Sequence, residues 1–446
     1  SHIKAGKRGG VHSLPSKCSA HTYTDTERHE WVVEQRKQRI GCPGSRGGAV
    51  MSRSQWTCCV PLRPTFSRLP AHAPASCRPS QMQAVHQRGV GLPPPAKTGH
   101  AASQDEKREF MSIFPDLVRD LTEVGTHSDI PDAQKWFAKV LQYNAVGGKM
   151  NRGLAVSLSF KLLATQDLIT PENIKNAHIM GWCIELLQSF FLVADDIIDG
   201  SKLRRGKPAW YLNDNLGPSA FNDAILMEAG IYKILHKHFA HVPYYVDMLD
   251  LFHEMTLKTA LGQALDLLSC PPGQKPILKK FTMERYNSIV KYKTSFYSFY
   301  LPIALSMYMA GITDRELHRQ ARTILVEMGQ FFQVQDDYLD CFGDSSITGK
   351  IGTDIGKGKC TWLSVVALQR ASPSQRLVME EHYGVPEEES IRKIKGLYKE
   401  LNLPATYRAY EESTSSMIRT HIQQISRGLN HNVFFNFLDK IHKRSS

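Results

Sequence analysis

Two clusters of aspartates stand at the ends of apolar stretches in this chain of 446 residues. "FFLVA" leads into the first cluster and "FFQVQ" into the second. On a helix of 3.6 residues per turn, the first and last acid of each cluster share one face. Because carboxylates beside an apolar core are costly without a counter-charge, each cluster predicts a bound cation or basic neighbours. The acids are Asp195, Asp196 and Asp199 in the first cluster and Asp336, Asp337 and Asp340 in the second.

Basic side chains surround both clusters in the sequence. They occur in "GGKMNRG", which precedes a helix, in "LRRGK" after the first cluster, and in "TGKIGTDIGKGK" after the second. Guanidinium and ammonium groups suit phosphate oxygens, and two acidic helix faces that meet would suit a hard cation such as Mg²⁺. One acidic cluster alone is more often a solvated surface, but two beside basic loops favour a metal and phosphate site. The basic candidates are Lys149, Arg152, Arg204, Arg205, Lys350, Lys357 and Lys359.

Helices must position these residues, because apolar side chains recur with a helical period from Asp105 onward and strand signals are weak. Thr170 is a predicted N-cap and Pro171 the first residue of a helix that runs to the first acidic cluster. Residues 294–313 are 20 consecutive uncharged residues, long enough to span a bilayer. Their hydroxyl groups and Pro302 favour a buried core helix instead, and no transmembrane segment is expected. The helical periodicity of residues 105–446 therefore predicts a single all-α domain.

The amino-terminal part differs in composition from this body. Residues 1–100 carry 15 Lys and Arg against four acids, whereas the remainder carries 40 against 39. A basic surface for nucleic acid is therefore not expected on the body, and we expect no nucleic-acid partner. From Met51 to Gln104 there are six basic residues and no acid, which is typical of a mitochondrial presequence. We expect residues 1–104 to be a disordered basic extension. Met51 is a candidate start of translation, and the mitochondrial matrix is the expected location of the protein. A tail that is not a presequence would leave the protein in the cytoplasm.

The motifs occur in a recognisable order. "GGKMNRG", "FFLVADDIID", "LRRGK", "SIVKYKTSFYSFYLPIA", "FFQVQDDYLDCFGD" and "TGKIGTD" together resemble the eukaryotic farnesyl diphosphate synthases, a family of short-chain trans-isoprenyl diphosphate synthases. The resemblance implies an all-α fold with helices around a deep central cavity, a homodimer, and three Mg²⁺ ions per active site, for which Mn²⁺ or Co²⁺ could substitute. The implied reaction joins isopentenyl diphosphate to dimethylallyl diphosphate and then geranyl diphosphate through an allylic carbocation, giving farnesyl diphosphate.

The resemblance also implies a role for each candidate residue. The six aspartates would hold the metal ions, with Asp340 acting less directly. Arg204, Lys293, Lys350 and Lys359 would bind the allylic diphosphate. Lys293, Thr294 and Gln333 would stabilise the carbocation. The isopentenyl diphosphate site would consist of Lys149, Arg152, Gln188, Arg205, Phe332 and Arg444.

Product length is expected to depend on Phe190 and Phe191. They precede Asp195 by five and four residues, which places them roughly 6–7.5 Å below the diphosphate along a helix. Aromatic rings there would stop chain growth at the C15 product. One alternative keeps the fold but makes geranyl diphosphate, or switches between C10 and C15 with the metal. A terpene cyclase and a non-catalytic regulatory subunit are further alternatives, against which the complete set of acids and of isopentenyl diphosphate candidates argues.

Overall fold

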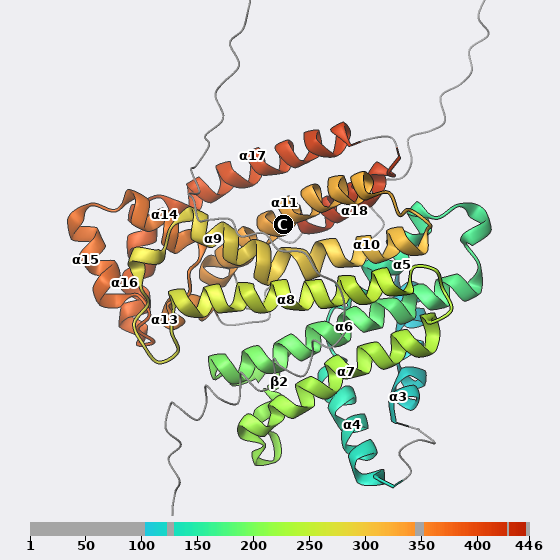
Figure 1. Cartoon of the computed structure of the whole chain (residues 1–446). Coiled ribbons are helices and arrows are strands. Elements are labelled where there is room, and N and C mark those ends of the chain that lie inside the picture. The colour runs from blue at the N-terminus through green and yellow to red at the C-terminus, as the bar shows by residue number, and fades with distance from the viewer. Residues whose placement is uncertain (1–102, 123–128, 344–351, 426–427, 443–446) are drawn as a thin grey trace, which may run out of the picture. The chain divides into compact units, whose positions relative to one another are not determined.

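The computed structural model describes residues 103–122, 129–343, 352–425 and 428–442 (Figure 1). These residues belong to one compact unit, Gly91–Ser446. Within them nearly every element is a helix, and the two strands, β1 (Leu203–Arg204) and β2 (Lys207–Pro208), form one short antiparallel ladder. The all-α prediction is confirmed. The expected extension, residues 1–104, falls almost entirely outside the described residues, so its boundary stays a prediction.

Long helices build much of the body, and shorter ones lie among and around them (Figure 1). The long helices are α6 (Pro171–Asp199), α7 (Ala220–Phe239), α8 (Tyr245–Ser269), α11 (Arg315–Phe342) and α17 (Leu403–Gln424). The shorter ones are α2 (Gln104–Ser112), α3 (Phe114–Thr122), α4 (Pro131–Asn144), α5 (Asn151–Leu163), α9 (Met283–Val290), α10 (Leu301–Met309), α13 (Asp354–Lys357), α14 (Trp362–Arg370), α15 (Pro373–His382), α16 (Glu388–Glu400) and α18 (His431–His442). Short 3₁₀ turns are η1 (Gln166–Leu168), η2 (Trp210–Asn215), η3 (Gly217–Ser219) and η4 (Leu278–Lys280).

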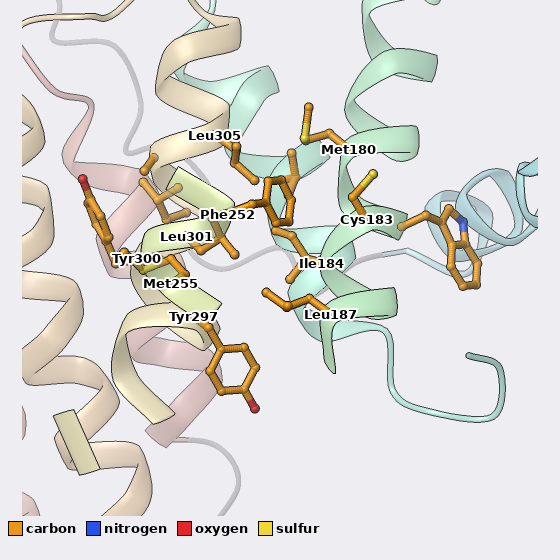
Figure 2. Close-up of a cluster of buried hydrophobic side chains, with 14 of the residues drawn as sticks. Met180, Cys183, Ile184, Leu187, Phe252, Met255, Tyr297, Tyr300, Leu301 and Leu305 are labelled. Carbon is orange, nitrogen blue, oxygen red and sulfur yellow. The ribbon is translucent and has the colours of Figure 1, made fainter. Parts of the chain in front are cut away.

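Helix α6 carries the first acidic cluster at its carboxyl end. As predicted, the Thr170 side chain caps its start by accepting a hydrogen bond from the backbone N–H of Asn173, and Pro171 is its first residue. Gly200 ends the helix in the left-handed conformation. The helix is long and apolar enough to cross a membrane, but 78% of its most apolar 18-residue window is buried inside the protein. It is therefore a core helix, packed against α8 and α10 in the cluster of Figure 2.

Two glycines let α5 cross α6 at close range. A Cβ atom at Gly181 would lie 2.4 Å from the carbonyl oxygen of Gly153, so neither position has room for a side chain. The backbone N–H of Gly153 donates to Oε1 of Glu185 at 2.8 Å, which satisfies a donor in the first turn of α5. This crossing fixes the start of α5, and with it Arg152, against the helix that carries the first acidic cluster.

A wider helical winding interrupts the helix that begins at α9 and ends at α10. Residues Lys291–Tyr300 form the π-helix η5, and Leu301 N–H donates to the carbonyl of Phe296, five residues back. Pro302 follows directly and has no N–H with which to continue an α-helical ladder. The predicted buried helix over 294–313 is present and largely buried, but its first part is π-helical rather than α-helical.

The π-helix is held between two other helices at glycine positions. A Cβ atom at Gly262 of α8 would lie 2.1 Å from the backbone nitrogen of Lys293, and one at Gly329 of α11 would lie 2.5 Å from Cβ of Ser295. Backbone therefore packs directly against backbone on the α8 side. This close packing holds Lys293 and Thr294 between α8 and α11, the second of which bears the second acidic cluster.

Candidate active site

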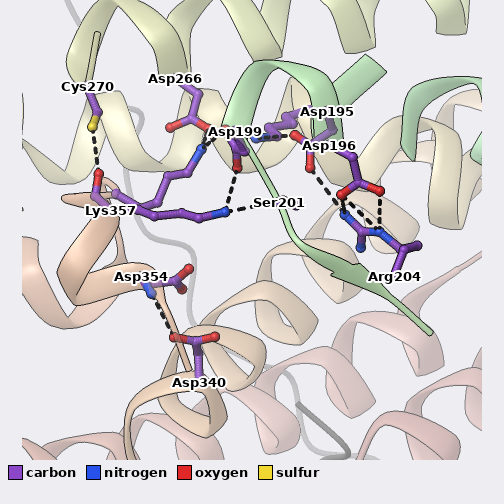
Figure 3. A network of polar contacts seen from close by, with 12 residues as sticks. Asp195, Asp196, Asp199, Ser201, Arg204, Asp266, Cys270, Asp340, Asp354 and Lys357 are labelled. Carbon is purple, nitrogen blue, oxygen red and sulfur yellow. Dashed lines mark hydrogen bonds and ion pairs between the residues drawn. The ribbon is translucent and has the colours of Figure 1, made fainter. Parts of the chain in front are cut away.

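The three acids of the first cluster have different surroundings (Figure 3). Asp196 is buried and accepts hydrogen bonds from Nη2 of Arg204 at 2.5 Å and from Nε at 3.0 Å. Burial alone would lower the pKa of Arg204, but the carboxylates around it, Asp196 first, raise the pKa overall. Asp195 and Asp199 are more exposed and have lysine partners, and Oδ2 of Asp195 also lies 3.7 Å from Nη2 of Arg204. Asp196 therefore makes the closest contacts to Arg204, whereas Asp195 and Asp199 are shared with lysines.

Asp266 of α8 is the centre of a network that the sequence analysis missed. Its side chain is 7% exposed and lies 2.6 Å from Nζ of Lys293 and 3.6 Å from Nζ of Lys359. Burial would raise the pKa of Asp266, but the two ammonium groups outweigh it and lower the pKa below its ordinary value. The same contacts raise the pKa values of Lys293 and Lys359 against the opposing effect of burial. Both lysines therefore stay charged and are held in place.

Lysines of the segment around α13 connect it to the end of α6 (Figure 3). Nζ of Lys359 lies 3.0 Å from Oδ1 of Asp199, and Nζ of Lys357 lies 3.4 Å from Oδ2 of the same carboxylate. Asp340 of the second cluster contacts this segment as well, because its Oδ2 accepts the backbone N–H of Asp354 at 3.0 Å. Asp340 therefore positions the lysine-bearing loop.

Asp337 is buried and its carboxylate accepts three hydrogen bonds. The donors are the Tyr286 hydroxyl at 2.7 Å, Nε2 of Gln333 at 2.9 Å and the backbone N–H of Trp362 at 2.9 Å. Burial raises the pKa of Asp337 to about 7, although these hydrogen bonds act in the opposite direction. Asp336 is less buried than its neighbour. The two adjacent acids of each cluster therefore point into different environments.

Two consecutive residues of the π-helix connect the two acidic helices. Lys293 places Nζ 3.7 Å from Oδ1 of Asp195 on α6. Thr294 donates its hydroxyl to Oε1 of Gln333 on α11 at 3.2 Å. This dipeptide therefore relates the two acidic clusters to each other in space.

The donor set suits a hard cation that shares its ligands with a phosphate. Among the described residues, no three His, Cys, Asp or Glu side chains form a group that could hold a metal ion by themselves. Mg²⁺ in proteins is commonly bound through one or two carboxylates and completed by water and substrate phosphates. Asp195, Asp199 and Asp336 offer such carboxylates, and the nearby cations could bind the same phosphate. The residues therefore fit Mg²⁺ together with a diphosphate.

The comparisons with known proteins agree with this geometry. The sequence model described as polyprenyl synthetase matches residues 134–401. The chain belongs to the polyprenyl synthetase family. It is 49% identical over 354 residues to a farnesyl pyrophosphate synthase of Nezara viridula, covering 79% of this chain and 86% of the relative. It is 50% identical over 341 residues to the Homo sapiens farnesyl pyrophosphate synthase, covering 76% and 81%.

A solved structure is similar over the same region. The farnesyl diphosphate synthase of T. brucei in complex with risedronate superposes with a TM-score of 0.68 at 30% identity, covering 75% of this chain and 97% of that one. The resemblance inferred from the motifs is thus confirmed, and this polyprenyl synthetase is a prenyltransferase.

The isopentenyl diphosphate candidates of this polyprenyl synthetase lie near the start of α5. Nε of Arg152 donates to Oγ of Ser298 at 2.9 Å, and Oε1 of Gln188 accepts the Tyr297 hydroxyl at 2.6 Å. Nη1 of Arg205 donates to the carbonyls of Asn144 and Val146, so Arg205 supports the turn that carries the exposed Lys149. A cavity of about 270 Å³ lies beside Arg152, with Ser298, Phe299 and Phe332 also in its wall, whereas Lys149, Gln188 and Arg205 do not line it. None of the six aspartates lines that cavity.

Tyr297 is a second residue that the sequence analysis missed. Its hydroxyl contacts Gln188, the Arg152 guanidinium lies 5.2 Å from its ring centroid, and its ring lies 5.6 Å from that of Phe191. Phe191 in turn lies 4.8 Å from Phe190. One tyrosine thus joins the expected chain-length residues to the expected isopentenyl diphosphate site. Two other candidates, Lys350 and Arg444, lie outside the described residues.

Proposed function

We propose that this polyprenyl synthetase condenses isopentenyl diphosphate with dimethylallyl diphosphate and then with geranyl diphosphate, and releases farnesyl diphosphate. The observation that carries the proposal is the Lys293–Thr294 pair, which contacts Asp195 of one acidic cluster and Gln333 beside the other. A diphosphate at the carboxylates would thereby have its reacting carbon near polar oxygens of the π-helix and α11. The names of the relatives at 49% and 50% identity support the same product.

Basic side chains of this site would bind the allylic diphosphate and stabilise it as it leaves. Arg204, Lys293 and Lys359 are held charged by Asp196, Asp266 and Asp199, and Lys350 is a further candidate. Mg²⁺, bound through the cluster carboxylates with three ions per site expected, would supply Lewis-acid stabilisation of the departing diphosphate; Mn²⁺ or Co²⁺ could substitute. Prearranged charges of this kind cost little reorganisation at the moment of reaction.

The carbon left behind would be an allylic cation, which the chain must stabilise and protect from water. The oxygens of Thr294 and Gln333 offer negative dipole ends, and the buried aromatic rings of the π-helix exclude water. Isopentenyl diphosphate would lie with its phosphates at Lys149, Arg152, Gln188, Arg205 and Arg444 and with Phe332 beside its carbon chain. Its double bond attacks the cation, and a proton then leaves to the released diphosphate.

A homodimer is part of the proposal. Apolar side chains of α8 at Leu257, Leu261 and Leu268 are exposed and share one helix face, and Phe221 and Ile225 are exposed on α7. A second copy could cover this surface. Light scattering should give the mass of a dimer for the wild type and of a monomer for a Leu257→Glu/Leu261→Glu variant. A variant that remains dimeric would exclude this surface as the interface.

We also propose a mitochondrial location, supported by the six basic residues and the lack of acids between Met51 and Gln104. Residues 51–104 fused to a fluorescent reporter should direct it into mitochondria. A cytoplasmic reporter would contradict the proposal and leave the enzyme in the cytoplasm.

The decisive test of function is a product assay with both the full chain and residues 105–446. Isopentenyl and dimethylallyl diphosphate are supplied with Mg²⁺, then with Mn²⁺ or Co²⁺, and product lengths are resolved by chromatography. A dominant C15 product with every metal supports the proposal. A C10 product, or a product that changes with the metal, would instead assign a geranyl diphosphate synthase or a dual synthase. A lack of condensation would contradict the proposal and favour a cyclase or a regulatory subunit.

A further inference from the structure

The two oxygens of the Asp337 carboxylate have separate partners. Oδ2 accepts both the Tyr286 hydroxyl and the backbone N–H of Trp362. Oδ1 accepts Nε2 of Gln333, one helical turn earlier on α11. Asp337 is 5% exposed, so these buried donors satisfy both oxygens of its carboxylate. The identified hydrogen-bond partner of Oδ1 is therefore the side-chain amide of Gln333.

That contact determines which way the Gln333 amide points. Nε2 is the amide atom that faces Oδ1 of Asp337, and because an ionised carboxylate only accepts hydrogen bonds, the ionised form of Asp337 keeps the amide oxygen facing the opposite way. On that opposite side Oε1 accepts the hydroxyl of Thr294 at 3.2 Å. The hydroxyl hydrogen of Thr294 is thereby directed at Gln333, and the lone pairs of its oxygen are left for other contacts. A chain of two hydrogen bonds orients both dipoles.

We propose that Asp337 is a positioning residue that fixes the polarity of the Gln333 amide and the Thr294 hydroxyl, so that both present oxygen to the allylic cation. This inference rests on the proposed function. It gives Asp337 a task different from the metal binding that the resemblance implied. A reversed amide would present N–H groups to the developing positive charge and would oppose the reaction.

The arrangement of the partners makes Asp337→Asn a sharp test. The introduced amide oxygen can take the Oδ2 position and keep the hydrogen bonds from Tyr286 and Trp362. Its nitrogen then takes the Oδ1 position and donates towards Gln333, whose amide must reverse to accept. The variant thus has a way to keep its buried hydrogen bonds while it reverses one dipole. We expect kcat to fall on the order of a hundredfold, as for loss of one prearranged electrostatic contact, with KM for isopentenyl diphosphate little changed.

A second substitution should restore the polarity. In Gln333→Glu/Asp337→Asn, the introduced amide donates to one carboxylate oxygen of residue 333 and the other oxygen again faces Thr294. We expect kcat to rise above that of Asp337→Asn. In the Gln333→Glu variant alone, the carboxylates of residues 333 and 337 face each other. Adding Asp337→Asn to that variant should therefore increase kcat, whereas the same substitution decreases kcat in the wild type. This comparison still decides the question if Asp337→Asn alone fails to fold.

Binding of a charged analogue gives a readout that does not depend on turnover. Dimethylaminoethyl diphosphate carries a protonated nitrogen where the cation would form, and isopentyl diphosphate is its neutral counterpart. At pH 8 with Mg²⁺, calorimetry should show that Asp337→Asn loses about tenfold of the wild-type preference for the charged analogue. Tyr286→Phe is the matched control, because it removes a hydrogen bond from Oδ2 and leaves Oδ1 in place. It should lower the melting temperature and keep the preference.

The outcomes separate the inference from the function on which it rests. Wild-type protein that forms no condensation product defeats the proposed function. If the wild type forms product normally, two results would overturn the inference alone. One is an unchanged analogue preference in Asp337→Asn. The other is no gain in kcat when Asp337→Asn is added to Gln333→Glu. An equal loss of preference in Tyr286→Phe would also overturn it, since stability would then explain the effect.

Discussion

The rings of Phe191 on α6 and Tyr297 on the π-helix lie 5.6 Å apart, centroid to centroid. Phe190 lies against Phe191, so three aromatic rings form a wall between two helices below the acidic cluster. Replacing Phe190 and Phe191 together with Ala should remove that wall and yield products longer than C15. Chromatography of the dephosphorylated products checks this. The same product distribution as the wild type would show that the chain ends elsewhere.

Asp266→Asn should destabilise the protein and lower its activity. Lys293 and Lys359 would lose the buried carboxylate that they share, and breaking a buried pair from one side costs about 3–5 kcal/mol. We expect the lower end of that range, because Asp195 and Asp199 remain near the two lysines. Urea unfolding at pH 7 measures the difference. Unfolding free energies equal to those of the wild type would mean that Asp266 contributes little.

The stabilising effect of Asp266 should depend on pH in one direction. Its pKa is lowered in the folded protein, so its contribution is fully present above the unfolded carboxyl pKa of about 3.9. The contribution is lost as the pH falls through the lower folded value. The stability gap between wild type and Asp266→Asn should therefore be constant from pH 7 to about pH 5 and shrink below pH 4. A gap that widens in acid would contradict this assignment.

Gly181→Ala should destabilise the crossing of α5 and α6. The added Cβ would meet the backbone carbonyl of Gly153 at 2.4 Å, which no side-chain rotation can relieve. We expect a loss of about 1–3 kcal/mol, as for other overpacked sites, together with reduced affinity for isopentenyl diphosphate because Arg152 begins the same helix. Gly396→Ala on α16 is the control, since nothing lies within 4 Å of its added Cβ. It should stabilise the protein by about 0.5–1 kcal/mol, and thermal melting of both variants checks the pair.

The sequence predicted the helices and the acidic faces well, because both depend on local periodicity. It could not show that Asp196, more closely than Asp195, contacts Arg204, since that depends on how the loop after α6 folds back. Asp266 was missed because a single acid between apolar residues carries no motif, and its importance comes from Lys293 and Lys359 of other segments. The π-helix was missed because an uncharged run indicates burial without indicating winding. Pro302 was the one local sign of it.

The wider winding of η5 makes the number of residues in this segment as important as their identity. The i→i+5 ladder of a π-helix encloses one residue more than the i→i+4 ladder of an α-helix, so a segment one residue shorter between Lys291 and Tyr300 could close as an α-helix. Leu301 and Leu305 would then keep their places in the interior cluster of Figure 2. The change would fall on the winding that sets Lys293 beside Asp195 and Thr294 beside Gln333, so a one-residue gap in this stretch would be expected to alter the site before it altered the core.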